Sequence, residues 1–564
     1  MRKPDWAEDK VDEQDQLLAA DGIGHSGLLG GWRNLVWAEQ EFGTHNRKKQ
    51  TGERIMASAN IGTWGWIWVG VFMCLFVGMG VYGMRKTKTE EDFAVARGSY
   101  GPVLLAFAFA ATIASGATFM SVPGMAYSIG FGSLWLSALY PIGIYIGMVL
   151  AIKLIKRAGD RFRSNSLADF MGQRYQSEFL RIAFALLSIL LIYYIAAQVV
   201  AAATMFEVLL DLNYKTGILV SVGVIALYVG MGGSHADIMT DGVQGVMMVL
   251  IALIIAAMFI FAPGVDSVDG ASGPAAINAA VVAQDPSLGW DNYFVTGNIF
   301  FDNIWLVLLL LVAHIPFAMN PHIGKLAFAL KDSKQIRTFL LIAIPISSML
   351  TLTVLGGLHA RAMVGEGLRP DSAIPILFTQ LFPPFLAGML GVGVLSAIMS
   401  TSDGLFIAIA VTLSNDLYKR TLAPMVHKHK TEQQIDHIAL NISRVSIVIV
   451  AAAAIALAWD PPKFLAVLLW VGVGCIVSGA AGPLVIGSMW RRATKTGAIA
   501  SFCTGVILYA ILYLDFFVGW KNPFAVAGTC IIVASTVMVV VSLLTRPLPE
   551  EHLELVFNPR GVPA

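Results

Sequence analysis

The residues of this chain best suited to chemistry lie in one apolar run, GVGVLSAIMSTSDGLFIAIAVTLSNDLY, which extends from Gly391 to Tyr418. A carboxylic acid and a cluster of hydroxyls interrupt the middle of this run: Ser396, Ser400, Thr401, Ser402 and Asp403. Such groups are costly inside a bilayer unless they face a partner, an ion or a water-filled cavity. The run therefore predicts a helix that holds a polar site at membrane depth.

Four small residues of this run share one helix face, because Ala397, Ser400, Thr401 and Gly404 have the spacing i, i+3, i+4 and i+7. Small side chains allow a second helix to approach closely. Hydroxyls and a carbonyl without a hydrogen bond are also oxygen ligands for a small hard cation. The segment by itself leaves both interpretations open, helix packing and an ion site.

The composition of the chain is that of a membrane protein. Of the 564 residues, 56% are hydrophobic and only 13% are charged, and the mean hydropathy is +0.70. Ordinary soluble domains carry about 25% charged residues. Apolar segments long enough to cross the roughly 30 Å hydrocarbon core of a bilayer recur along the chain. We predict an all-α polytopic protein in a lipid bilayer, and the net charge of +1 gives no reason to expect a nucleic-acid partner.

Hydropathy predicts thirteen transmembrane helices. They cover residues 61–84, 102–128, 133–155, 180–210, 216–232, 240–263, 297–319, 337–361, 382–412, 438–458, 463–489, 496–516 and 523–545. Residues 1–58 are polar and predict a disordered N-terminal tail without a signal peptide. Residues 549–564 predict a short cytoplasmic tail. Hydrophobic sequence begins directly after Met56, which makes this residue a second candidate start of translation.

Lysines and arginines set the expected orientation, because cytoplasmic loops are enriched in them. Connections that follow odd-numbered spans hold most of these residues, at 85–88, 153–181, 325–337, 419–430, 491–495 and 546. The other connections hold few. We therefore expect the N-terminus outside the cell and the C-terminus in the cytoplasm, in the plasma (inner) membrane.

Helix-breaking residues interrupt the second and seventh spans. The second, LLAFAFAATIASGATFMSVPG, contains Ser115, Gly116 and Pro123, and the seventh, IWLVLLLLVAHIPFAMNPHIG, contains Pro316 and Pro321. Proline removes a backbone donor and glycine loosens a helix, so amides and carbonyls become free at membrane depth. The breaks are five spans apart, and this odd offset inverts one half of the protein relative to the other. Such pairs point to the central site of a secondary transporter, and two unrelated proline kinks are the alternative.

Four blocks of sequence resemble the sodium:solute symporter family, over about residues 60–545. They are Ala-Ile-Met-Ser-Thr at 397–401 with Asn-Asp-Leu-Tyr at 415–418; Gly-Gly at 232–233 with Ala236, Thr-Asp at 240–241 and Gln244; Pro-Gly at 123–124 with Ala-Tyr at 126–127; and Arg492 with Gly-Ala at 497–498. The resemblance implies a leucine-transporter-like fold with two inverted five-helix repeats. The first repeat would cover 102–263, the second 297–489 and the trailing helices 490–548, within one symporter domain at 59–548.

Sodium is the co-transported ion that the resemblance implies. In the family it lies between the broken helix and the ninth span. Matching the motifs position by position places carbonyl ligands at Ala111, Ala114 and Ala397 and hydroxyl ligands at Ser400 and Thr401. Five neutral oxygens suit sodium.

Some relatives bind a second sodium with a further hydroxyl pair and the aspartate of the Thr-Asp block. Here that pair is replaced by Asp403 and Gly404, while Asp241 is present. The two carboxylates are candidates for a second cation site, or they share a proton, since like charges raise one pKa. Alternatively, Asp403 bonds a neighbouring helix and only orients Ser400.

The resemblance also narrows the range of substrates that we expect. Proline-type members carry an aspartate in the broken helix where this chain has Ile113, and sugar-type members use more polar core residues than this chain offers. The segments at 383–388 and 458–462 resemble the pantothenate and monocarboxylate branch. An anionic solute would suit free amides near 115–118. The candidate substrate contacts, each as compatible with an ordinary polar core residue, are Thr118, Tyr194, Gln198, His314 and Asn320.

The hypothesis from the sequence is sodium-coupled symport of a small organic solute by alternating access, with pantothenate or a short monocarboxylate as the favoured substrate. Proton coupling in the same fold is one alternative, and sodium-coupled uptake of proline or a sugar is another. A membrane-embedded enzyme is a distant alternative, because only His235, Asp237 and Asp241 form a reactive cluster and no catalytic motif accompanies it. We therefore expect no enzymatic activity.

Overall fold

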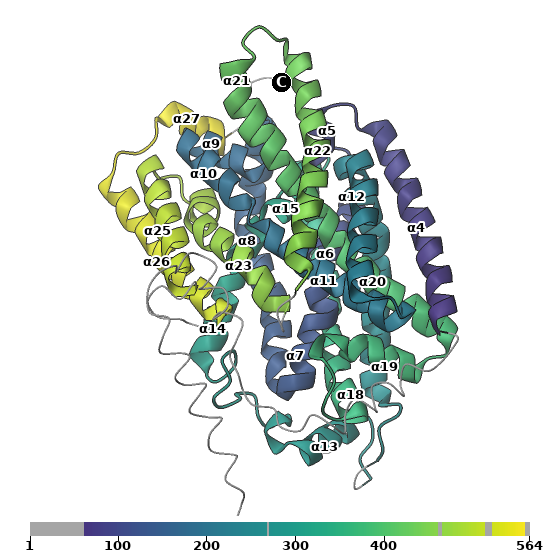
Figure 1. Ribbon diagram of the computed structural model, residues 1–564. Coiled ribbons are helices and arrows are strands. Elements are labelled where there is room, and N and C mark those ends of the chain that lie inside the picture. The colour runs from purple at the N-terminus through teal and green to yellow at the C-terminus, as the bar shows by residue number, and fades with distance from the viewer. Residues whose placement is uncertain (1–60, 268–269, 461–464, 514–521, 559–564) are drawn as a thin grey trace, which may run out of the picture. The chain divides into compact units, whose positions relative to one another are not determined.

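The regular structure of this protein consists of helices (Figure 1). The computed structural model describes residues 61–267, 270–460, 465–513 and 522–558, so the tail predicted at 1–58 lies outside the described residues. Within these ranges, the β contact is a single isolated bridge between Tyr100 and Leu330. The prediction of an all-α protein is confirmed.

Ten helical runs of the described chain are long and apolar enough to cross a membrane, and a bent pair makes eleven. One run, Ala117–Phe162, joins the end of the second predicted span to the third, and another, Tyr214–Phe261, joins the fifth to the sixth. Both runs continue across a glycine with non-helical backbone, Gly130 in the first and Gly233 in the second, and these two joins account for the difference from thirteen. The long helices are α4 (Ile61–Lys86), α8 (Leu134–Phe162), α11 (Leu191–Leu210), α12 (Tyr214–Phe261), α17 (Ile336–Leu350), α18 (Val354–Val364), α20 (Pro384–Val411), α22 (Glu432–Ala458), α23 (Leu465–Ala480), α25 (Lys495–Tyr513) and α26 (Pro523–Leu544).

Helix α12 is bent at Gly233, which has φ of 53° and ψ of −147°. A positive φ of this kind is open to glycine and strained for other residues. Residues thirteen apart in a straight helix are separated by roughly 20 Å. Tyr228 and Asp241 nevertheless both approach Asp403, so the two parts of α12 must converge on the same point of α20.

The first predicted break lies at the end of α6 (Pro102–Ile113). Ala114 leaves the helical region with ψ of 76°, and the chain resumes as a π-helical turn, η1 (Ala117–Ser121), followed by α7 (Val122–Ile129). The interruption predicted from the serine, glycine and proline content of this span is therefore present in the structure.

The second predicted break lies at Asn320. The helix pair on its two sides, Ile304–Met319 and Pro321–Ala329, is bent by 52°. The first helix of the pair begins at Ile304 and not at residue 297 as predicted, because the side chain of Asn303 caps it by accepting from the amides of Trp305 and Leu306. The elements of this region are α14 (Ile304–His314), η4 (Ile315–Met319), α15 (Pro321–Gly324) and α16 (Leu326–Ala329).

The connections contain further short helices. The predicted loop at 264–296 is one example, since α13 lies within it and packs Ile277 and Val281 against Leu358. The C-terminal segment is another, since His552 and Leu553 of α27 are buried. These helices are α5 (Glu90–Val95), α9 (Leu167–Tyr175), α13 (Pro274–Gln284), α19 (Ala373–Leu381), α21 (Ala423–Val426) and α27 (Glu550–Phe557). Helix α10 (Glu178–Ser188) instead forms one membrane-spanning run with α11.

Four basic residues from the connections used to orient the chain are buried: Lys156, Arg174, Arg181 and Lys325. Three of them bond to backbone carbonyls, as Arg181 does with Asp416 at 2.6 Å. The fourth, Lys325, pairs with a buried aspartate. These four charges are therefore structural parts of the protein and not solvated loop residues.

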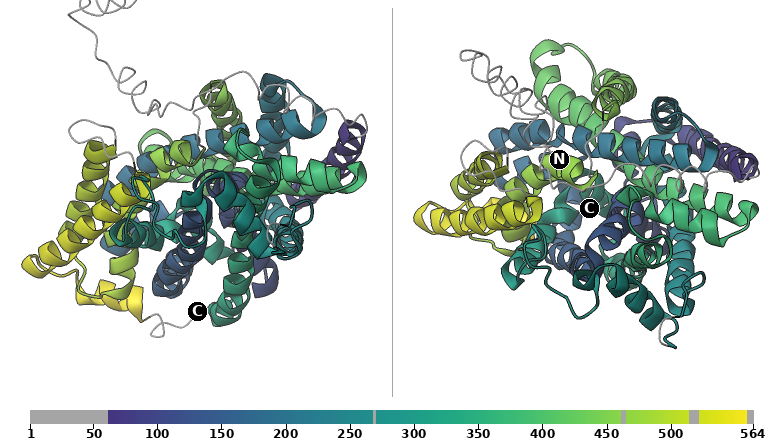
Figure 2. Two further views of the ribbon diagram at one scale, coloured as in Figure 1. Left: turned by 90° about the horizontal axis from the view of Figure 1, so that it is seen from below. Right: turned by 60° about the horizontal axis from the view of Figure 1, so that its bottom comes forward.

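Helix α20 is enclosed by other helices, with every residue from Leu390 to Val411 buried. Helices α4, α6, α11 and α12 pack against it. Figure 2 shows α4 in purple and the α25–α26 pair in yellow at opposite edges of this helical unit. The hydroxyls and the carboxylate of α20 cannot reach water across these neighbours, so they need protein partners or bound ions.

Close helix packing also fixes the second break. A Cβ atom placed on Gly147 of α8 would lie 1.7 Å from the carbonyl oxygen of Ile315, at the start of η4. Only glycine allows the two backbones to approach this closely.

Outside the membrane-spanning segments, Glu90 of α5 is fully buried. Its Oε2 accepts from Asn165 at 2.8 Å and lies 3.6 Å from the Lys419 ammonium. Burial raises the pKa of Glu90 from its usual 4.5 to about 7, although the Lys419 charge and the Asn165 hydrogen bond lower it. Glu90 therefore favours the folded state below pH 4.5 and loses this contribution as the pH rises through 7.

We expect Glu90→Gln to flatten the pH dependence of stability. Linkage predicts that the wild-type protein loses about 3 kcal/mol of unfolding free energy between pH 4.5 and pH 7.5 through this residue. Thermal unfolding of the purified protein at a series of pH values measures the slope. Equal slopes for the variant and the wild type would contradict the assignment.

Candidate functional site

The hydroxyl of Ser400 meets the end of the first broken helix. Its Oγ lies 3.1 Å from the carbonyl oxygen of Ala111 and 2.9 Å from that of Ala397. A serine hydroxyl has a single proton, so it cannot satisfy both carbonyls fully. Three oxygens therefore gather between α6 and α20, with lone pairs that can ligate a cation.

Thr401 makes the neighbouring contact, because its Oγ1 donates to the carbonyl of Thr112 at 3.0 Å. The hydroxyl of Thr112 lies 2.8 Å from Oδ2 of Asp241 and 2.9 Å from the carbonyl of Ala108. Thr112 thus connects the hydroxyls of α20 with a carboxylate of α12.

The last carbonyls of α6 accept hydrogen bonds from side chains where helix amides are missing. The N–H of Ala114 still bonds to Ala110. The carbonyls between them accept from side chains of two other helices: Ala111 from Ser400 and Thr112 from Thr401, both of α20, and Ile113 from Tyr140 of α8. The ends of helices leave such carbonyls without helical partners. The break at Ser115 therefore supplies the carbonyl oxygens of this site.

The structure brings most of the predicted sodium ligands together. Ala111, Ala397 and Ser400 are in direct contact, and Thr401 is beside them on the same helix face. Ala114 is buried at the break, but the two hydroxyls bond to Ala111 and Thr112 and not to its carbonyl.

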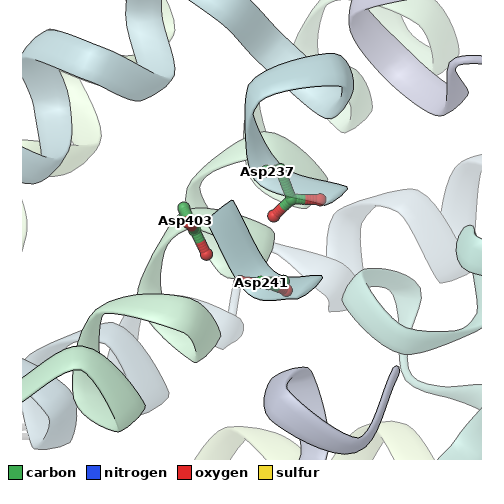
Figure 3. Close-up of side chains that lie close together, drawn as sticks. All are labelled: Asp237, Asp241 and Asp403. Atoms are coloured by element: carbon green, nitrogen blue, oxygen red, sulfur yellow. The ribbon is translucent and has the colours of Figure 1, made fainter. Parts of the chain in front are cut away.

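Three aspartates meet next to Thr112 (Figure 3). Carboxylate oxygens of Asp237, Asp241 and Asp403 lie within 4.8 Å of one another, and all three residues are buried. Asp237 and Asp241 are one turn apart on α12, and Asp403 is on α20. The structure therefore brings together the two predicted carboxylates, Asp241 and Asp403, and adds a third.

The cluster has one cationic partner. The Nζ of Lys325 lies 3.0 Å from Oδ2 of Asp237, and the hydroxyl of Tyr228 donates to Oδ2 of Asp403 at 2.9 Å. Three ionised carboxylates and one ammonium would give a net charge of −3 + 1 = −2. A buried charge of this size requires protons or cations.

Polar atoms without hydrogen-bond partners surround the same cluster. Among the described residues they include Oδ1 of Asp241, the side-chain amide of Gln244 and both ring nitrogens of His322. A Cβ atom placed on Gly404 would come no closer than 3.6 Å to its neighbours, one of which is Oδ1 of Asp237. These are ordinary van der Waals distances, so the missing side chain of Gly404 leaves room for one atom beside polar groups that lack partners.

The reactive cluster considered for an enzyme is not assembled. His235 bonds to the hydroxyl of Tyr100 through Nδ1 at 2.9 Å, whereas Asp237 and Asp241 face Lys325 and Thr112.

A cavity of about 50 Å³ adjoins both broken helices. Aromatic rings and hydroxyls form most of its wall, and the described lining contains no acidic residue, lysine or arginine: Ser115, Ala117, Thr118, Ser121, Val122, Met125, Leu136, Ser137, Tyr140, Tyr194, His314, Phe317, Thr351, Leu469, Trp470 and Phe524. Sites for small organic molecules usually measure about 300–1,000 Å³. The cavity must therefore widen to admit a solute.

Three of the five predicted substrate contacts line this cavity: Thr118, Tyr194 and His314. The other two lie outside the cavity wall and form hydrogen bonds with backbone groups at the two helix breaks. Oε1 of Gln198 accepts from the amide of Gly116 at 2.9 Å, and the Asn320 amide group donates to the Phe317 carbonyl at 2.8 Å.

Three of the amides predicted to be free at the first break have partners. Gly116 donates to Gln198, Ala117 to the hydroxyl of Ser115, and Thr118 to the carbonyl of Ser115. The expectation of free amides for an anionic substrate is therefore wrong for this conformation. Gln198 and Ser115 supply the acceptors for these amides, and no sequence pattern indicated these contacts.

The cavity wall also contacts one acid outside the membrane-spanning segments. Asp371, in η7 (Pro370–Ser372), is hydrogen-bonded to the side chain of Ser121. Burial raises the pKa of Asp371 to about 6, while the Ser121 hydrogen bond and the Arg369 charge lower it. The charge at this edge of the cavity therefore changes as the pH passes through 6.

Sequence reasoning missed three residues of the site: Thr112, Tyr228 and Lys325. The position of Lys325 directly after the second break could have indicated a role in the site, because a lysine next to a broken helix lies near freed polar groups. The i, i+4 spacing of Asp237 and Asp241 also indicated a shared face. Nothing in the local sequence indicated that Tyr228 reaches Asp403, because that contact depends on the bend of α12.

The sequence was compared with protein-family models and known proteins. The model described as "Sodium:solute symporter family" matches residues 93–505.

Several relatives resemble most of the chain. A sodium/pantothenate symporter from Escherichia coli (strain K12) is 27% identical over 457 residues, covering 78% of this chain and 89% of the relative. The osmoregulated proline transporter OpuE from Bacillus subtilis (strain 168) is 26% identical over 463 residues, covering 78% and 86%.

A solved structure of a Na+-coupled sialic acid symporter, in a substrate-bound outward-open state, superimposes with a TM-score of 0.69. It is 16% identical and covers 86% of this chain and 98% of that one. This likeness shows the fold, and it agrees with the leucine-transporter-like arrangement expected from the sequence.

Proposed function

This chain belongs to the sodium:solute symporter family, and on that premise we propose that it couples the uptake of a small carboxylate to the entry of sodium. The protein is a secondary transporter and not an enzyme. One observation carries the proposal: the Ser400 and Thr401 hydroxyls meet carbonyls at the point where α6 breaks.

Sodium would bind between α6 and α20, with oxygens from Ala111, Ala114, Ala397, Ser400 and Thr401. The contact distances of about 3 Å between the two helices support this set, because a small shift would admit a cation among oxygens that already face each other. A bound sodium would hold the broken helix against α20 and shape the adjoining cavity. Coupling requires that the two transport states differ in sodium affinity.

Asp241 and Asp403 would form a second position for a cation or a proton. The excess of carboxylates over cationic side chains in their cluster supports this. Thr112 would couple the two positions, because it bonds to Thr401 at the first and to Asp241 at the second.

A carboxylate substrate is supported by the character of the cavity wall. An ammonium group would lack an acidic partner in the described lining, whereas a carboxylate could accept from hydroxyls such as those of Ser115 and Thr118. The pantothenate symporter among the relatives points to the same class. Pantothenate and short monocarboxylates are the substrates to test first.

The driving force would be the sodium gradient with the membrane potential, which contributes about 2.3 kcal/mol per charge per 100 mV. The distribution of lysine and arginine supports a plasma-membrane protein with its N-terminus outside and its C-terminus in the cytoplasm.

Uptake into proteoliposomes tests the proposal, with labelled pantothenate, acetate, pyruvate, proline and glucose and with sodium or proton gradients imposed separately. Sodium-driven uptake of a carboxylate is the expected result. Uptake driven only by protons would transfer the coupling role to Asp241 and Asp403. Sodium-driven uptake of proline or glucose would refute the carboxylate and leave sodium coupling intact.

We expect Thr118→Val to raise the KM for the solute roughly tenfold, because it removes a hydroxyl from the cavity wall at nearly constant volume. The sodium concentration for half-maximal uptake should stay unchanged. Thr529→Val is the matched control, since the Thr529 hydroxyl bonds to Ala525 within α26. An unchanged KM in Thr118→Val would place the solute elsewhere.

A further inference from the structure

A second concave surface lies between α8 and α17, away from the residues proposed for transport. It is a groove with a volume of about 440 Å³. Basic side chains gather in it together with aliphatic ones. The groove is open on the outside of the helical unit, where the exposed aliphatic side chains of membrane-spanning helices face lipid.

Three basic residues line the groove: Lys153 of α8, Lys334 before α17 and Arg337 in its first turn. All three are exposed, and within the described residues none of them forms an ion pair. One acid lies next to them in sequence, Asp332, and its Oδ1 accepts from the backbone amide of Lys334 at 2.9 Å. The cluster therefore keeps a net positive charge.

Aliphatic side chains line the rest of the groove. Val149 is 52% exposed, Leu341 63% and Ile344 37%, so the described part of the chain leaves them uncovered. Ile152 and Ile336 form the buried floor.

Contacts between the two helices show how these residues are ordered. The hydroxyl of Tyr145 bonds to the carbonyl of Ala343 at 2.7 Å, and the ammonium of Lys156, eleven residues later, bonds to the carbonyl of Phe328. Higher numbers in α8 thus face lower numbers beside α17. Lys153 therefore lies toward the end that holds Lys334, whereas Leu341 and Ile344 lie toward the end marked by Tyr145, with Val149 between them.

We propose that this groove binds an anionic phospholipid. The phosphate headgroup would contact the basic end, and an acyl chain would lie along the aliphatic end. Basic pockets between transmembrane helices are suited to anionic headgroups, and the segregation of charge from aliphatic surface matches the two parts of a lipid. Helix α17 packs against α6 through Phe339 and Phe109. The lipid would therefore bind to a helix that contacts α6, which carries part of the proposed sodium site.

Binding of phosphatidylglycerol to the purified full-length protein in detergent tests the proposal, with native mass spectrometry and thermal unfolding as readouts. Phosphatidylcholine with the same acyl chains and inorganic phosphate are the comparison ligands. The triple variant Lys153→Ala/Lys334→Ala/Arg337→Ala should bind phosphatidylglycerol roughly 100-fold more weakly, at about fivefold per removed charge.

The matched control is Lys88→Ala/Lys428→Ala/Lys430→Ala, which removes three exposed charges outside the groove. Affinity for phosphatidylglycerol that is lost in the groove variant and kept in the control supports the proposal. Equal losses in both variants would indicate general attraction to positive charge and overturn it. Stabilisation by phosphatidylcholine or inorganic phosphate that equals that by phosphatidylglycerol would also overturn it.

A second variant, Val149→Ala/Leu341→Ala, tests the acyl-chain end without changing charge. It should weaken phosphatidylglycerol binding and leave the unfolding temperature of the lipid-free protein nearly unchanged, because both side chains are exposed. Wild-type affinity in this variant would restrict the interaction to the headgroup and refute binding of the whole lipid.

Discussion

Ser400→Ala and Thr401→Ala are each expected to weaken sodium binding by roughly 10- to 100-fold. Each substitution removes one oxygen from the set that faces the broken end of α6. A hydrogen bond or contact to a charged group contributes about 1.5–3 kcal/mol, which corresponds to this range of affinities. Alanine is small and helix-favouring, so both variants should fold.

Equilibrium binding of radioactive sodium to the purified protein measures the effect without knowledge of the solute. Ser402→Ala is the matched control. Ser402 is equally buried on α20, but its hydroxyl donates to the carbonyl of Ile398 within the same helix at 2.7 Å. We expect wild-type affinity in this control. Wild-type affinity in both Ser400→Ala and Thr401→Ala would rule out the proposed sodium site.

Lys325→Met is expected to destabilise the protein by about 3–5 kcal/mol, the usual cost of removing one partner from a buried ion pair. Lys325 is 4% exposed and pairs with Asp237. Its loss would leave three clustered carboxylates without a cationic side chain, a change in net charge from −2 to −3 if all are ionised. Chemical unfolding of the purified variant measures the difference.

The double variant Lys325→Met/Asp237→Asn separates charge from packing. It removes one positive and one negative charge, so the net charge of the cluster returns to −2, and most of the stability should be recovered. Arg163→Met is the control, since Arg163 is 75% exposed in its pair with Glu91 and exposed pairs contribute about 1 kcal/mol or less. No recovery in the double variant would assign the effect of Lys325 to packing.

The two predictions concern neighbouring parts of one site. Thr112 accepts from Thr401 through its carbonyl, and its hydroxyl faces Asp241. A change in charge at the carboxylates can therefore alter the position of a sodium ligand without direct contact. Sodium binding to Lys325→Met, measured under conditions where this variant stays folded, would reveal that coupling.

The membrane-spanning helices, the two breaks and the polar face of α20 could all be predicted from the amino-acid sequence. These features depend on local properties. Hydrophobic length fixes a span, while Gly116 and Pro321 weaken the backbone wherever they occur in it. The spacing of Ser400 and Thr401 places both hydroxyls on one side of any helix. The family resemblance then named the partner helix, α6, through its alanine carbonyls.

Which of these groups are in contact depends on how the helices pack, and the sequence did not predict it. Tyr228 and Asp241 reach the same aspartate because α12 bends at Gly233. Hydropathy separated two spans near this point, but it has no information on the direction of the bend. Lys325 looked like a loop charge and instead pairs with Asp237 inside the protein. Hydrogen bonds between helices depend on packing distances and not on sequence spacing, so the chain alone could predict the oxygens at Ser400 and Thr401 but not the contact of Thr401 with Thr112.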